Sequence, residues 1–159
     1  KAAPHIDKLM KKNPDVNYVF QEFPIFSSRF EGSKVGSEAG FAIYNLYGSK
    51  AYMQFHNKMF LGKNANKDEG KLKKSDVYKV IESIPGVKIK EVKEYMKNKA
   101  GSLVNNSMQL GASLGFGGTP AFIIMPLKGA NASNTKVIGG YVDYITLQSS
   151  LNDVKNSIK

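Results

Sequence analysis

Residues 104–124 read VNNSMQLGASLGFGGTPAFII and bring three kinds of local structure together. Leu103, Ser107, Leu110 and Leu114 recur at helical spacing. The glycine-rich residues 115–118 reverse the chain, and residues 121–125 form an apolar run of strand length. This stretch therefore predicts a helix, a tight turn and a strand in succession.

The glycines before Thr119 do not fit a phosphate-binding loop. Such a loop follows a strand and opens a helix, with lysine and then serine or threonine after its last glycine. Here the glycines follow a helix and precede a strand, so they indicate a chain reversal between two packed elements. Taken alone, Thr119-Pro120 is an ordinary proline before an edge strand, because only about 5–6% of such bonds are cis.

The two ends of the chain show mixed helix and strand patterns. Apolar residues within 2–10 follow helical spacing, Asn13-Pro14-Asp15 is a turn signal, and residues 16–20 alternate like a strand. Near the other end, residues 136–138 predict a second short strand, and Asp143 is a good N-cap for a final amphipathic helix.

The middle of the chain is helical by pattern. Residues 27–37 are rich in serine and glycine and predict a loop. Four or five helices follow as far as Leu114, with Ser75 as an expected N-cap and Pro85-Gly86 as a break. The order is α-β, then helices, then β-β-α, which favours one α/β layer interrupted by a helical insertion.

The net charge is +10 and the isoelectric point near 9.6. A basic surface attracts anionic partners, but Arg29 is the only arginine, and arginine is the usual residue for reading phosphates and bases. The lysines are scattered along the chain, so most are interpreted as solvated, and no nucleic-acid partner is expected. No stretch reaches the roughly 20 apolar residues of a membrane span.

The residue types exclude several kinds of chemistry. There is no cysteine, so the chain holds no disulfide, thiolate nucleophile or thiolate metal site. The two histidines, His5 and His56, show no metal-ligand spacing, and His56 lies on an apolar stripe typical of a core or edge position. No G-x-S-x-G motif or local carboxylate pair is present. We therefore predict no catalytic residue, metal or cofactor within these residues.

Helix, glycine turn, Gly118-Thr119-Pro120-Ala121-Phe122 and apolar strand together resemble the cis-proline segment of the thioredoxin superfamily. Residues 104–124 are similar to the DsbA branch, as is the Glu22-Phe23-Pro24 signature after the first strand. Within that branch the chain looks most like the Com1-like group of secreted or surface-associated bacterial proteins.

The resemblance implies an α/β thioredoxin-like fold with a helical insertion, lacking the first strand and the C-x-x-C motif. Residues 1–26 and 115–159 would form the thioredoxin-like part, and residues 27–114 the insertion. In the family a proline follows the second cysteine by five residues. If Pro4 is that proline, the motif ends two residues before Lys1, and the chain is expected to be a redox-inactive fragment of a thiol–disulfide oxidoreductase.

The resemblance also implies a substrate site at Gly118, Thr119 and Pro120. The backbone of Thr119 would pair with an extended polypeptide by strand addition, and its hydroxyl would influence the thiolate. Exposed sheet edges would favour self-association. A periplasmic or cell-surface location is implied by the family alone.

Two other functions stay open. One is a non-catalytic, peptide-binding or chaperone-like module on the same scaffold, and the other is a lysine-rich surface or nucleic-acid binder. The sequence before Lys1 distinguishes the first of these from an enzyme. Whether the parent oxidises, isomerises or reduces, and which proteins it acts on, is not encoded in these residues.

Overall fold

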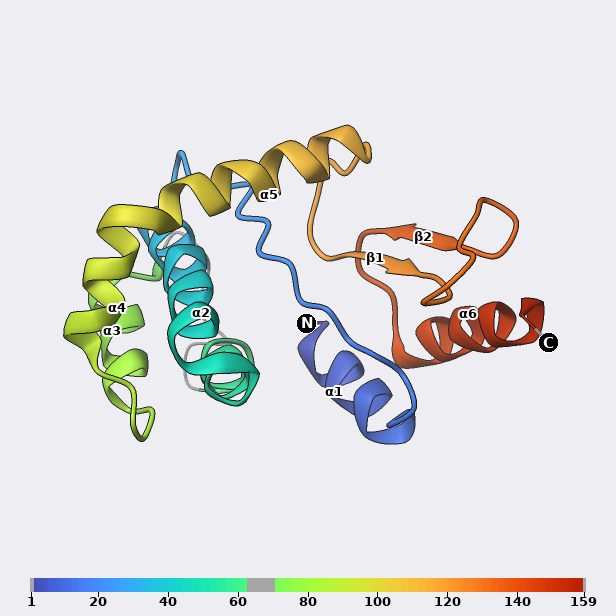
Figure 1. Cartoon of the computed structure of the whole chain (residues 1–159), viewed down its shortest axis with the longest axis horizontal. Coiled ribbons are helices and arrows are strands. Elements are labelled where there is room, and N and C mark those ends of the chain that lie inside the picture. The colour runs from blue at the N-terminus through green and yellow to red at the C-terminus, as the bar shows by residue number, and fades with distance from the viewer. Residues whose placement is uncertain (1, 63–70, 159) are drawn as a thin grey trace. The chain divides into compact units, whose positions relative to one another are not determined.

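The computed structural model describes residues 2–62 and 71–158 (Figure 1). The chain forms two compact units. Lys1–Val19 and Phe116–Lys159 make one, the α/β unit, and Phe20–Gly115 make the other, the helical unit. These units divide after residues 19 and 115. The family division at residues 26 and 114 stays a prediction.

The α/β unit contains two helices and a two-stranded sheet. Its elements are α1 (Ala3–Lys12), β1 (Ala121–Ile124), β2 (Lys136–Gly139) and α6 (Tyr144–Ser157). The strands are antiparallel, with Ala121 opposite Gly139 and Ile124 opposite Lys136. Both strands lie where the sequence predicts them.

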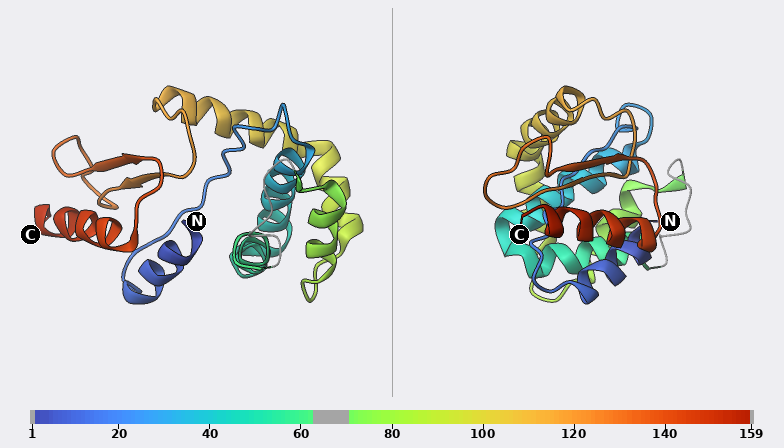
Figure 2. Two further views of the ribbon diagram at one scale, coloured as in Figure 1. Left: turned by 180° about the vertical axis from the view of Figure 1, so that it is seen from behind. Right: turned by 90° about the vertical axis from the view of Figure 1, so that its right-hand side faces the viewer.

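One face of this sheet packs on α1 and α6 through the side chains of one apolar cluster. Figure 2 shows α6 lying beside the two strands. Side chains alternate across a strand, so Phe122 and Ile124 share a face. They pack with Leu9, Leu147 and Leu151, which are buried. Ile123 belongs to the other face and is 42% exposed.

Side-chain hydrogen bonds fix the ends of both helices. The Asp143 carboxylate accepts from the Thr146 backbone N–H at 2.8 Å, which confirms the predicted N-cap of α6. Asn13, just after α1, donates through Nδ2 to Gln148 Oε1 on α6 at 2.8 Å. Asn13 is buried, and this contact fixes the end of α1 against α6.

The helical unit is built around one long kinked helix. Its elements are α2 (Glu31–Phe60), α3 (Lys74–Glu82), α4 (Ile89–Tyr95), the π-helical turn η2 (Met96–Ala100) and α5 (Gly101–Ser113). Gly48 breaks α2 with a φ of 78°, a conformation that glycine adopts readily. The core is formed by α2, α3 and α4, with Ile43, Ile81 and Val92 fully buried.

Three local predictions are wrong. Residues 16–20, predicted as a strand, join no sheet in the described chain, where β1 pairs with β2 alone. The loop predicted over residues 27–37 becomes helical at Glu31. Ser75 lies inside α3, and the N-cap is Lys73, whose backbone N–H donates to Asp76 Oδ2 at 3.0 Å.

A carboxylate is enclosed within the helical unit. Glu22 accepts hydrogen bonds from the Tyr52 hydroxyl at 2.8 Å and from the Ser37 hydroxyl at 3.1 Å. Gly40 makes room for it, since a Cβ there would lie 2.5 Å from Glu22 Oε1. Burial raises the pKa of Glu22 above its ordinary value, and the two hydrogen bonds offset only part of that rise.

The raised pKa of Glu22 gives the stability of the chain a pH dependence. Between the unfolded value near 4.5 and the higher folded value, the folded state binds more protons. Its free energy of unfolding therefore falls as pH rises through that window. The side chain introduced by Glu22→Gln does not titrate, so this variant lacks the pH dependence. From pH 4 to pH 7, the free energy of unfolding of the wild type should therefore fall relative to that of the variant.

Urea unfolding of both proteins at the two pH values measures this difference. Tyr52→Phe, which removes a hydrogen bond to the carboxylate, should enlarge the loss because the folded pKa rises further. A difference between wild type and Glu22→Gln that does not change with pH would contradict the account.

Candidate functional site

The loop between α5 and β1 holds the three residues singled out by the sequence. Gly115, with a φ of 75°, ends α5, and its N–H donates to the Ala112 carbonyl at 3.0 Å. The chain then passes through Gly118 and Thr119 to Pro120. The Thr119–Pro120 peptide bond is cis, and β1 begins at the next residue.

One end of this loop is fixed and the other is open. The Gly140 N–H donates to the Pro120 carbonyl at 2.8 Å, which extends the β1–β2 ladder by one bond. Thr119 is exposed, while Gly118 and Pro120 are partly buried. Within residues 2–62 and 71–158, Thr119 makes no hydrogen bond through its backbone or its hydroxyl. Its polar groups are therefore available to a ligand.

The strand beside the loop has an available edge. In the part of the chain that the structure describes, β1 pairs only with β2. The other edge of β1 presents backbone N–H and C=O groups, and an extended peptide can add to such an edge as a further strand. Thr119 and β1 together can thus hold a polypeptide through main-chain hydrogen bonds.

His5 connects the first turn of α1 to this loop. Its Nδ1 accepts from the Tyr144 backbone N–H at 3.2 Å, so a neutral ring carries its proton on Nε2. Nε2 then donates to the Tyr141 hydroxyl oxygen at 2.9 Å. Tyr141 directly follows Gly140, the residue bonded to Pro120. The N-terminal turn of α1 therefore lies beside the Pro120 loop.

The sequence did not indicate this role for His5, because its partners lie more than 130 residues away. A lone histidine in a first turn has no local signal for such a contact.

The N-cap of α1, Ala2, makes no side-chain capping bond. The first N–H groups of a helix are positively polarised and favour an anion, such as a thiolate.

His56 takes no part in this site. It lies in the helical unit with its ring 4.8 Å from the ring centres of both Phe20 and Phe60. Burial lowers the pKa of His56 below its ordinary value. The described residues contain no group of histidine, cysteine and acidic side chains able to hold a metal ion.

None of the helices within residues 2–62 and 71–158 is both long enough and apolar enough to cross a bilayer.

No protein-family model and no curated protein matches this chain. Solved structures do. BcfH of Salmonella enterica Typhimurium is 31% identical with a TM-score of 0.80, over 96% of this chain. ScsC of Proteus mirabilis in a compact conformation is 20% identical with a TM-score of 0.72, over 99%. A thioredoxin-like oxidoreductase from Silicibacter pomeroyi DSS-3 is 23% identical with a TM-score of 0.72, over 98%.

The alignments extend over nearly all of this chain but over less of its relatives. The chain spans 63% of the length of BcfH, 76% of ScsC and 78% of the Silicibacter protein. The thioredoxin-like fold with a helical insertion, expected from the sequence, is confirmed by these neighbours. In its fold, the chain is similar to the DsbA-like members of the thioredoxin superfamily.

Proposed function

We propose that this chain is the substrate-facing part of a thiol–disulfide oxidoreductase that acts on extended polypeptides. In this proposal the redox cysteines precede Lys1 as a C-x-x-C motif at the start of α1, and the chain alone is redox-inactive. The observation that carries it is the contact of His5 with Tyr141, which brings the first turn of α1 beside the Pro120 loop.

The chemistry follows from that juxtaposition. A thiolate at the α1 N-terminus is stabilised by free backbone N–H groups, which lowers its pKa. In exchange, a substrate thiolate attacks one sulfur of the enzyme disulfide and forms a mixed disulfide, while the other enzyme sulfur leaves as a thiolate. A second substrate thiolate then displaces the enzyme, so the substrate is oxidised and the enzyme reduced. Thr119 would hold the peptide through its backbone groups during both steps.

The test begins with the full-length protein from its native source, sequenced through Lys1. A C-x-x-C motif ending two residues before Lys1 is expected. The full-length protein should then oxidise a reduced two-cysteine peptide in a glutathione buffer, and the 159-residue chain should not exceed the rate of buffer alone.

Two variants of the full-length protein test the role of Thr119. Thr119→Pro removes the backbone N–H, so the KM for the peptide should rise about tenfold, equal to one lost hydrogen bond of roughly 1.4 kcal/mol. Thr119→Val keeps the backbone, and its KM should stay within about twofold of wild type. Thermal unfolding checks that both fold. Equal KM values in two folded variants would contradict a main-chain contact at Thr119.

A second function, peptide binding without catalysis, is favoured by the absence of cysteine from all 159 residues. It would be established if the residues before Lys1 contain no cysteine and the full-length protein binds peptides without exchange. A periplasmic or cell-surface location and self-association through the available edge of β1 are part of the same proposal. A single monomeric species in analytical ultracentrifugation would contradict the proposed self-association.

A further inference from the structure

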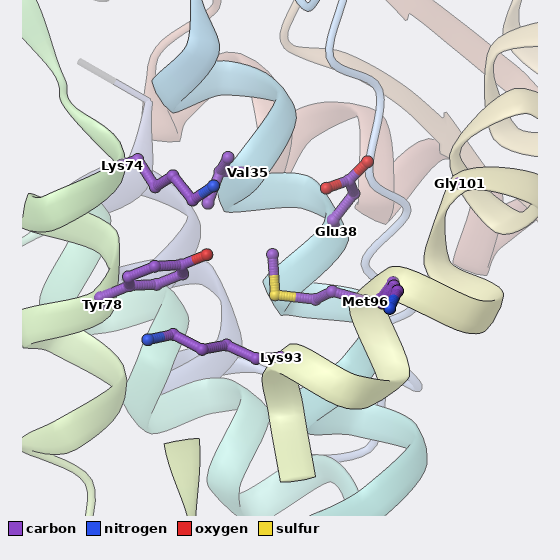
Figure 3. A pocket seen from close by; sticks show the side chains of 8 residues that line it. Val35, Glu38, Lys74, Tyr78, Lys93, Met96 and Gly101 are labelled. Carbon is purple, nitrogen blue, oxygen red and sulfur yellow. The ribbon is translucent and has the colours of Figure 1, made fainter. Parts of the chain in front are cut away.

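A second feature, independent of cysteine chemistry, lies wholly within the helical unit. A pocket of about 350 Å³ opens between α2, α3 and the α4–α5 segment (Figure 3). Its size is that of the smaller ligand sites in proteins. The lining residues are Val35, Glu38, Lys74, Tyr78, Lys93, Met96, Lys97 and Gly101.

Three lysines from different elements converge on this pocket. Lys74 begins α3, Lys93 lies on α4, and Lys97 lies on the π-helical turn η2. None of the three forms an ion pair within residues 2–62 and 71–158. The three lysines are not adjacent in the sequence, whose scattered lysine pattern predicts mostly solvated side chains.

Tyr78 lies near two of these ammonium groups. Its ring lies between the Lys74 and Lys93 side chains in Figure 3. Lys93 Nζ is 4.2 Å from the ring centre, and Lys74 Nζ is 5.6 Å from it. A cation over an aromatic face is attracted by the ring, which offsets part of the repulsion between neighbouring lysines.

The charge of the pocket is positive on balance. Glu38 is the one carboxylate among the lining residues, and it faces Lys34 Nζ at 4.0 Å. Residues 71–100 contain nine lysines and four acidic residues, a net charge of +5, which is half of the +10 of the whole chain. This concentration of charge favours an anionic ligand.

The pocket also has an apolar component. Val35 is only 6% exposed and Met96 packs on the edge of the core. Met96 and Lys97, consecutive residues, both line the pocket on the π-helical turn, a geometry that is frequent at functional sites. Inorganic phosphate has no apolar part to occupy this surface, whereas an acidic peptide with an apolar side chain does.

A second hollow adjoins the first. It has a volume of about 310 Å³, shares Glu38 and Gly101 with the pocket, and adds the polar residues Ser27, Ser28 and Asn105. A Cβ at Gly101 would meet nothing within 4 Å, so there is free space beside this shared lining residue. Several consecutive residues of a peptide can therefore lie along the two hollows.

We propose that this pocket binds an acidic polypeptide segment, with its carboxylates at Lys74, Lys93 and Lys97 and an apolar side chain against Val35 and Met96. Recognition of a nucleic acid fits less well, because Lys93 already occupies a face of the Tyr78 ring on which a base would stack. The lysines also lack the planar fork by which arginine binds phosphate.

The test measures binding of fluorescent peptides to the full chain by anisotropy at low salt. Glu-Glu-Leu-Glu-Glu should bind at least about tenfold more tightly than Gln-Gln-Leu-Gln-Gln, since each exposed ion pair contributes up to about 1 kcal/mol. The triple variant Lys74→Gln, Lys93→Gln and Lys97→Gln should lose about tenfold in affinity. Glu-Glu-Ser-Glu-Glu should bind about threefold more weakly than the leucine peptide.

The matched control is the triple variant Lys12→Gln, Lys50→Gln and Lys128→Gln. It removes the same charge from exposed lysines outside the pocket and should stay within about twofold of wild type. Equal losses of peptide affinity in the two triple variants would show that binding depends only on the overall charge of the chain, which would contradict the proposal. Tighter binding of single-stranded DNA at the same lysines, or competition by equimolar phosphate, would also overturn the proposal.

Discussion

Leu147→Ala is expected to lower the free energy of unfolding of the α/β unit by about 3 kcal/mol. Leu147 is only 1% exposed and lies in the cluster that joins α1, α6 and the sheet. Its removal leaves a cavity that the surrounding side chains cannot fill completely. A unit with two strands and two helices has few other buried side chains to compensate for the loss.

The same helix provides the control. Ile145, two residues earlier on α6, is 73% exposed, so Ile145→Ala should change the free energy of unfolding by no more than about 0.5 kcal/mol. Urea unfolding gives both values. Hydrogen exchange should locate the Leu147→Ala effect in α1, α6 and the two strands, because the packing partners of Leu147 lie there. Equal decreases in the free energy of unfolding for Leu147→Ala and Ile145→Ala would contradict the core position of Leu147.

Gly32→Ala should destabilise the helical unit by about 2 kcal/mol, although alanine is the better helix former. A Cβ at residue 32 would overlap the carbonyl oxygen of Leu72 and lie 2.7 Å from its carbonyl carbon. Backbone atoms cannot turn aside as a flexible side chain can. Either α2 or the segment before α3 must therefore move.

Gly36, one helical turn later on α2, should respond in the opposite direction. A Cβ there meets nothing within 4 Å, so Gly36→Ala should stabilise the chain by up to about 1 kcal/mol. The two changes are chemically identical and lie on one helix. Thermal unfolding that moves in the same direction for both would show that the contact with Leu72 is not close.

Those parts of the fold that depend on local signals were predictable from sequence. The strand at Ala121–Ile124 follows from a continuous apolar run, and the start of α6 from an aspartate placed to cap it. The Pro85-Gly86 break also lies where predicted, with Gly86 at a φ of 81° after the end of α3. In each case the residues involved are neighbours in the chain.

The predictions failed where partners from elsewhere in the chain decide the outcome. Residues 16–20 have the alternation of a strand, but a strand also needs a backbone partner, and the described chain supplies none. Serine and glycine near Glu31 indicated a loop, yet Gly32 is required by the approach of Leu72. The sequence indicated Thr119 and Pro120 as site residues because their motif is local. It did not indicate His5 or the lysines of the pocket, because their roles depend on partners from elsewhere in the chain.

The bond from Gly140 to the Pro120 carbonyl has a consequence for selectivity. It fixes the loop by main-chain atoms, whereas Thr119 is exposed and its main chain makes no hydrogen bond within the described residues. Every polypeptide carries the same N–H and C=O groups, whatever its side chains. Contacts of this kind accept many sequences almost equally, so under the proposed function any preference among polypeptides would have to come from side-chain contacts made away from this loop.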